Sequence, residues 1–216
     1  MSNFFCSSIG KKFVMSITGL FLVLFLLFHM SMNLVAVISL EGYDMICEFL
    51  GANWYAQIGT LVLAAGALLH IVFAVVLTLQ NIKARGAVGY QSPNHTDTEW
   101  AAKNMFVLGI IVLGFIGLHL CNFWAKMQLQ EITCDVSAQG SELIQTLFTN
   151  PVYVVLYLIW LAALWFHLTH GFWSALQTLG WNNNLWICRL KVIAWVVATI
   201  IALGFACVPV YFFIFQ

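Results

Sequence analysis

Charged residues are scarce in this sequence: Asp, Glu, Lys and Arg make up 7% of the 216 residues, whereas 62% are hydrophobic. A soluble domain carries about 25% charged residues, so this composition argues against a soluble globular protein. Basic and acidic residues number 8 each, so no net charge favours a nucleic-acid partner. The 6 cysteines form no Cys-x-x-Cys pair, which leaves a zinc site and covalent haem attachment unsupported.

The apolar residues are arranged in five long segments, and a membrane-spanning helix needs about 20 of them. We therefore predict an all-α protein: one polytopic membrane domain over residues 1–216 with five transmembrane helices. Asn150 and Pro151 predict the start of the fourth span as an N-cap and an N1 proline. Thr96 to Glu99 matches a capping box and predicts a helix that starts before the third span. The predicted spans are 13–40, 54–79, 105–124, 152–179 and 192–215.

Positive charge is concentrated on one side of the predicted membrane, with only Lys126 on the other side. The positive-inside rule then places the N-terminus in the cytoplasm and the C-terminus outside. Cys47 and Cys134 both fall in predicted outer loops, but nothing in the sequence fixes the distance that a disulfide needs. The cytoplasmic basic residues are Lys11, Lys12, Lys83, Arg85, Lys103, Arg189 and Lys191, and the outer acidic residues are Glu41, Asp44, Glu48, Glu131, Asp135 and Glu142.

One histidine lies deep in each of the first four spans: His29, His70, His119 and His167. Ionisable side chains inside a bilayer are costly and are usually functional. Neutral imidazole is also a common axial ligand of haem iron. A single histidine of this kind could merely hydrogen-bond a neighbouring helix, whereas four in four helices favour a shared cofactor role.

The depth of each histidine follows from a rise of about 1.5 Å per residue. His29 and His119 lie roughly 25 Å along outward-running helices, toward the outer side. His70 and His167 lie at matching depths in inward-running helices, displaced toward the cytoplasm. The sequence therefore predicts two metal planes, an outer one on His29 with His119 and an inner one on His70 with His167.

Other residues in the spans leave alternatives open. His170, one turn after His167, could contact a haem propionate or replace His167 as the ligand. His95 falls in a polar loop and is expected to be solvated. Three glycines could make room for flat macrocycles or could serve helix packing. These glycines are Gly66, Gly114 and Gly117.

The chain resembles, over essentially its whole length, the cytochrome b membrane anchor of succinate:quinone oxidoreductases in its five-helix, two-haem form. In detail it is similar to the fumarate reductases of Bacteroides-type anaerobes. In that family the span-four ligand lies four residues before a glycine, and His167 with Gly171 fits this spacing. Trp165 stands where some relatives carry a glutamate linked to transmembrane proton movement, which puts that route in doubt. The resemblance is carried by one histidine in each of the first four spans and by residues 48–55, 79–86 and 166–180.

The resemblance implies a bacterial cytoplasmic-membrane protein of anaerobic electron transport that binds two haems b. A flavoprotein subunit would interconvert fumarate and succinate, and an iron–sulfur subunit would carry electrons to or from this anchor. The inner haem would face the iron–sulfur subunit, and the outer haem would face the quinone, usually menaquinone. Dimers of the whole complex occur in the family. The direction, fumarate reduction or succinate oxidation, is not fixed by the sequence.

Four further residues are candidates for supporting roles. Glu48 sits among apolar residues before the second span, where burial would raise its pKa and let it accept a proton near the quinone; a solvated loop carboxylate is the alternative. Ser16, Lys83 and Arg189 could meet haem propionates. Ser16 corresponds to a polar position used this way in the family, and the two basic residues could equally be positive-inside residues.

Three other classes of protein compete with this interpretation. A transporter whose histidines relay protons would predict broken helices or an internal repeat, and neither is evident. A bare anchor would bind no cofactor. The cytochrome b of another quinone-linked oxidoreductase, such as a hydrogenase or a formate dehydrogenase, would also bind haem but would copurify with different soluble subunits.

Overall fold

The computed structural model describes residues 7–86, 99–134, 137–181 and 183–216, and all regular secondary structure in these ranges is helical. Five helices are long and apolar enough to cross a membrane, which confirms the predicted all-α membrane architecture. They are α1 (Ser8–Ile38), α3 (Trp54–Arg85), the helix formed by α5 and its continuation (Met105–Cys134), α8 (Pro151–Thr178) and α9 (Asn184–Phe215).

Side-chain caps define where several of these helices begin. The Asn150 side chain accepts a hydrogen bond of 2.9 Å from the Val152 amide, with Pro151 at the first helical position, as predicted. Asn183 caps α9 in the same way through the amide of Trp186. His95 and residues 96–98 of the predicted capping box lie outside the described residues. Glu99, the last residue of that box, is the N-cap of α4 (Trp100–Lys103).

The helices extend beyond the predicted spans because hydropathy marks only the part that crosses the bilayer, whereas a capped helix continues into water. Residues 41–53, predicted as an outer loop, form most of α2 (Leu40–Ala52). The third span contains α5 (Met105–His119), a π-helical segment η2 (Leu120–Leu129) and α6 (Gln130–Cys134). A further short helix, α7 (Gly140–Phe148), precedes α8.

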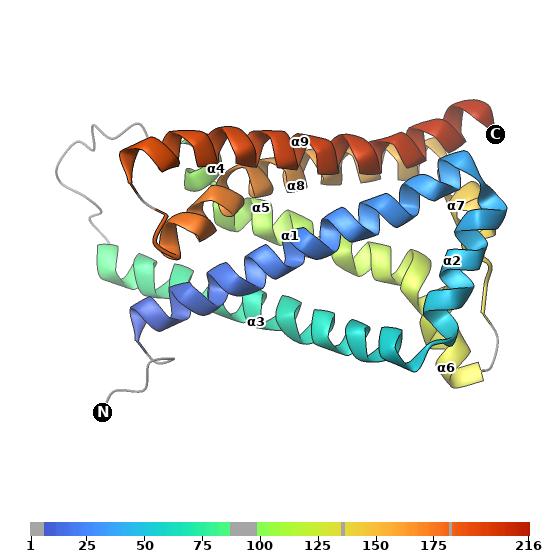
Figure 1. Cartoon of the computed structure of the whole chain (residues 1–216), viewed down its shortest axis with the longest axis horizontal. Coiled ribbons are helices and arrows are strands. Elements are labelled where there is room, and N and C mark those ends of the chain that lie inside the picture. The colour runs from blue at the N-terminus through green and yellow to red at the C-terminus, as the bar shows by residue number, and fades with distance from the viewer. Residues whose placement is uncertain (1–6, 87–98, 135–136, 182) are drawn as a thin grey trace.

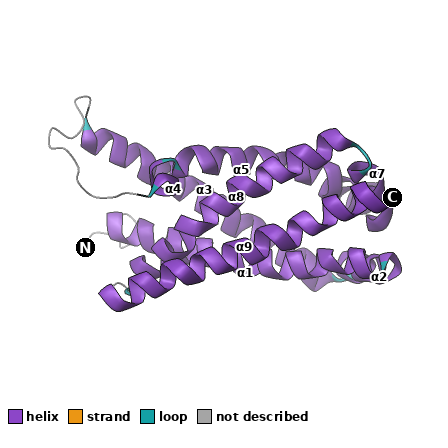
Figure 2. Cartoon of the chain, turned by 90° about the horizontal axis from the view of Figure 1, so that it is seen from above, coloured by secondary structure: helices purple, strands orange, loops and turns teal. Residues whose placement is uncertain are grey.

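The long helices form an elongated bundle in which α1 runs obliquely between α3 and α9 (Figure 1). Helix α8 packs on α9, α1 and α5, and is the most buried of the spans. Helix α3 packs mainly on α1 and touches α2; in the part of the chain that the structure describes it has no substantial contact with α5 or α8. The view in Figure 2 shows the same layered bundle from above.

The two ends of the bundle carry different elements. Helices α2, α6 and α7 and the C-terminus lie at one end, called here the outer end (Figure 1). The start of α1, the end of α3 and helix α4 lie at the other, called the inner end. Because the long helices alternate in direction, the seven basic residues predicted to share a side do gather at the inner end, whereas Lys126 lies toward the outer end.

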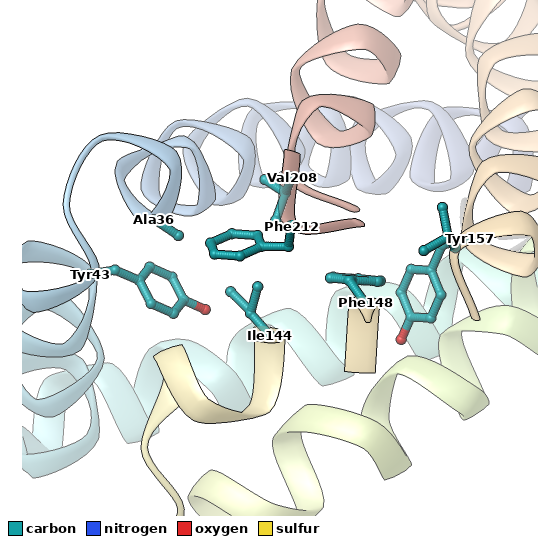
Figure 3. Packing of buried hydrophobic residues seen from close by; sticks show 8 residues of the cluster. Ala36, Tyr43, Ile144, Phe148, Tyr157, Val208 and Phe212 are labelled. Atoms are coloured by element: carbon teal, nitrogen blue, oxygen red, sulfur yellow. The ribbon is translucent and has the colours of Figure 1, made fainter. Parts of the chain in front are cut away.

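The outer end is closed by a cluster of buried apolar residues contributed by five helices (Figure 3). Asp44 links α2 to α7 at this cluster. Its carboxylate accepts a hydrogen bond of 2.8 Å from the Ser141 amide and one of 2.5 Å from the Ser141 hydroxyl. Since the first amides of a helix have no partner within it, Asp44 acts as a remote N-cap of α7. The cluster comprises Ala36, Tyr43, Ile144, Phe148, Val154, Tyr157, Val208 and Phe212.

Candidate functional site: two histidine pairs

The outer histidine pair is brought together by α1 and α5. The imidazole centroids of His29 and His119 are 5.8 Å apart and the ring planes cross at 83°. Phe25, one turn before His29, stacks on its ring at 5.3 Å, and Phe205 of α9 lies 5.6 Å from it. The predicted pairing of these two histidines is therefore observed as a direct ring contact.

His119 is the last residue of α5, immediately before the π-helical segment η2. π-helical turns are rare and occur frequently at functional sites, because the wider turn redirects side chains. The His119 ring also contacts Phe123 at 5.3 Å and Trp160 at 5.8 Å. Its Nδ1 atom is buried and has no hydrogen-bond partner among the described residues.

Asn33, one turn after His29, is a neighbour that the sequence reasoning missed. Its Nδ2 donates a hydrogen bond of 2.7 Å to the His29 carbonyl and lies 3.4 Å from Nδ1 of the same histidine. An amide at position i+4 from a histidine in an apolar helix is a sequence signal that could have identified it.

The inner pair comes from α3 and α8. His70 lies against α1, with its Nδ1 3.3 Å from the Met15 carbonyl and 3.4 Å from the Thr18 hydroxyl. His167 lies beside Gly109 of α5, and its Nδ1 is buried without a partner in the described part of the chain. The direct ring contact seen for His29 with His119 has no counterpart between His70 and His167 in the described part of the chain.

These arrangements can be compared with what a shared iron requires. Metal–imidazole bonds are about 2 Å long, so two rings that bind one metal from opposite sides have centroids about 6 Å apart. The 5.8 Å separation of His29 and His119 fits this geometry. For the inner pair, α3, which carries His70, makes no substantial contact with α5 or α8 in the described ranges.

No group of three or more His, Cys, Asp or Glu side chains in the described ranges could hold a metal ion. A haem site would not need such a group, because the protein would supply two axial ligands and the porphyrin the rest. A bis-histidine site leaves no open coordination position, so its chemistry is electron transfer rather than substrate binding.

The glycines near the histidines divide into two groups. A side chain at Gly114 or Gly117 would meet no atom within 4 Å, and both glycines are exposed. Gly66 is different, because a Cβ atom there would lie 3.1 Å from the Phe21 ring. The expectation that Gly66 makes room for a macrocycle is therefore wrong: it lets α3 approach α1.

His170 belongs to an ionic cluster at the inner end. Its Nδ1 lies 3.5 Å from one oxygen of Glu99, while the other oxygen of Glu99 lies 2.8 Å from Lys191 Nζ. Lys191 also lies over the ring of Trp173, 4.7 Å from its centroid. Burial by itself would raise the pKa of Glu99, but the hydrogen bonds and charges of Lys191 and His170 outweigh it and lower that pKa. His170 thus has a carboxylate partner, which favours His167 as the axial ligand.

The three residues predicted to contact haem propionates lie in different surroundings. Ser16 is buried in α1, next to the Met15 carbonyl that His70 approaches. Lys83 is exposed in the last turn of α3. Arg189 is exposed in α9, and its guanidinium lies 5.6 Å from the centroid of the Trp186 ring. Only Ser16 therefore lies close to a candidate ligand.

Glu48 does not have the burial that was expected of it. It lies in α2 at the outer end, and its side chain is exposed. The expectation failed because residues 41–53 form a helix that turns this position outward instead of a loop that packs it against the second span.

The cysteines are not paired where the structure describes them: Cys47 and Cys134 are both free thiols. Cys47 packs beside Tyr43 in α2, and burial raises the pKa of its thiol to about 11, although the hydrogen bond from Tyr43 opposes this shift. Cys47 is therefore a protonated structural thiol at neutral pH.

No protein-family model, curated protein or solved structure matches the chain in the comparisons made, so its candidate function rests on the sites described above.

Proposed function

We propose that this chain is the dihaem cytochrome b membrane anchor of a succinate:quinone oxidoreductase, working as part of a menaquinol:fumarate reductase. The observation that carries the proposal is the contact of His29 with His119, two residues from different spans whose rings are separated as a shared iron requires. The second pair, His70 with His167, is supported by the matching depths of the two residues in α3 and α8.

Haem bound between each pair would supply one-electron transfer, while the protein sets ligation, burial and polarity. His29 and His119 would hold the outer group among Phe25, Phe123 and Trp160, which exclude water from it. His70 and His167 would hold the inner group, with Ser16 available to a propionate. The two sites together span the bundle from its outer to its inner end.

The orientation follows from the charge at the inner end. The seven basic residues there support an orientation in which that end would face the cytoplasm, in a bacterial inner membrane. The iron–sulfur subunit would dock at this face, with the flavoprotein subunit that carries the fumarate chemistry bound beyond it. A quinone would then react near the outer pair. Glu48 is exposed at the outer end and lacks the burial on which its role as a proton acceptor was argued.

The proposal is tested by purifying the tagged chain from native membranes in mild detergent. We expect a flavoprotein and an iron–sulfur protein to copurify, and the complex to reduce fumarate with a reduced menaquinone analogue. Copurification of hydrogenase or formate dehydrogenase subunits would instead identify the cytochrome b of another quinone-linked oxidoreductase. Within an active complex, Glu48→Gln should retain both haems and quinol-linked turnover, as expected of a solvated carboxylate; loss of turnover with both haems bound would show that Glu48 accepts a proton after all.

A further inference from the structure

The imidazole of His70 lies in a cradle formed by three residues of α1. The Met15 carbonyl oxygen is 3.3 Å from Nδ1 of His70, and the Thr18 hydroxyl is 3.4 Å from the same atom. Gly19 completes the cradle, because a Cβ atom there would lie 3.2 Å from Cε1 of the ring. His70 therefore packs directly on the backbone of a neighbouring helix.

Both polar groups that face Nδ1 act as hydrogen-bond acceptors. A carbonyl oxygen has no proton to donate. The Thr18 hydroxyl proton is already directed at its own helix, toward the carbonyls of Val14 at 2.9 Å and Met15 at 3.1 Å. Nδ1 of a neutral His70 must then carry the ring proton, which leaves the lone pair of Nε2 free to bind a metal.

Gly19 is what lets the ring reach the carbonyl. A contact of 3.2 Å is tighter than a methyl group normally makes, so any larger residue would push the ring away from α1. The hydrogen bond to Met15 is already long at 3.3 Å and would be lost by a shift of a few tenths of an ångström.

The other three histidines have different surroundings. Nδ1 of His119 and of His167 has no partner among the described residues. Nδ1 of His29 lies 3.4 Å from the amide nitrogen of Asn33, which is a donor. Among the four paired histidines, which all lie in the described ranges, the acceptor cradle is thus specific to His70.

We propose that Met15, Thr18 and Gly19 are positioning residues that fix the tautomer of His70 and lower the reduction potential of the inner haem. This inference rests on the proposed function. A hydrogen bond from Nδ1 to a carbonyl orients the ring and makes the ligand more basic. A more basic ligand stabilises the oxidised iron, which carries the greater positive charge, and so lowers the potential.

The test in the purified complex is redox titration of both haems in Gly19→Ala. The midpoint potential of one haem should become more positive while the other stays unchanged. Thr18→Val should shift the same haem by a smaller amount, and Thr18→Ser should restore it. Gly66→Ala is the matched control, because it crowds the same α1–α3 interface against Phe21 instead of His70. Equal shifts in Gly66→Ala and Gly19→Ala, or no shift in Gly19→Ala, would overturn the proposal.

A second measurement does not depend on haem. In the full chain with ¹⁵N-labelled histidine, purified in detergent without added haem, the His70 resonance is assigned by its loss in His70→Gln. A proton on Nδ1 supports the cradle, and a proton on Nε2 overturns it. If the wild-type complex contains no haem but Nδ1 is protonated, the cradle stands as a structural feature while the proposed function and the effect on the potential both fail.

Discussion

The imidazole rings of His29 and His119 stand nearly perpendicular, with their centroids 5.8 Å apart, although they belong to different membrane spans. Neither histidine has an acidic partner near its ring in the described part of the chain: their ring contacts are to each other and to Phe25, Phe123, Trp160 and Phe205. A pair of imidazoles surrounded mainly by aromatic rings, with the Asn33 amide beside His29, is better suited to ligate a metal than to hold a proton.

Each pair should hold one haem independently. Alanine at His29 or His119 should reduce the haem content from two per chain to one, and alanine at His70 or His167 should do the same for the other haem. The double variant of His29 and His119 should lose no more than either single variant, since both residues hold the same iron. Pyridine haemochrome quantitation measures the content, and additive losses within a pair would contradict the assignment.

His170 should not be required for haem binding, because its Nδ1 faces Glu99. His170→Gln should therefore retain two haems per chain, whereas His167→Gln should retain one. The low-spin optical spectrum of the His170 variant should match that of the wild type. Loss of a haem in His170→Gln with retention in His167→Gln would exchange the roles of the two residues.

The carboxylate of Asp44 should stabilise the apolar cluster at the outer end by its hydrogen bonds to the N-terminus of α7. Asp44→Ala removes two hydrogen bonds to a charged acceptor, each worth about 1.5–3 kcal/mol, and should lower the thermal unfolding midpoint in detergent. Glu131→Ala, a matched change of an exposed carboxylate at the same end, should leave the midpoint unchanged. Equal effects of the two substitutions would show that the Asp44–Ser141 contact contributes nothing.

The ionic cluster at the inner end should be sensitive to acid. Interaction with Lys191 and His170 leaves Glu99 with a pKa below its ordinary value of 4.5. The stabilisation is therefore fully present above about pH 4.5 and is lost as the pH falls through the lower pKa of the folded state. Both partners are partly exposed, so the contribution is below about 1 kcal/mol.

Hydrogen exchange at the Lys103 amide, which donates to the Glu99 carbonyl, reports on this cluster. Protection relative to the intrinsic rate should fall at pH 3 compared with pH 6 in the wild type. In Lys191→Met the protection should be lower at pH 6 and change less with pH. If the protection changes with pH in the same way in the variant, Lys191 does not lower the pKa of Glu99.

The membrane-spanning helices could be predicted from the sequence because hydropathy reports directly on transfer into lipid. The short helix α2 could not, since its residues are neither apolar enough to cross a membrane nor marked by a strong periodicity, and its position depends on the contact of Asp44 with Ser141. The π-helical segment after His119 likewise has no recognised sequence signal.

The candidate site could likewise be predicted only in part. Depth along a helix is a one-dimensional quantity, so the pairing of His29 with His119 followed from residue spacing. The direction of a side chain depends on helix rotation and packing, so residue spacing could not decide between burial and exposure of Glu48 or identify the ionic partner of His170. The contacts of His70 with Met15 and Thr18 link distant parts of the chain through a backbone carbonyl, and no side-chain pattern encodes them.

The most direct test of the central claim is the haem content of the purified chain or complex, measured by pyridine haemochrome with a reduced-minus-oxidised spectrum. The account predicts two haems b per chain with the low-spin spectrum of bis-histidine ligation. A folded sample prepared with an ample haem supply that contains no haem would contradict it.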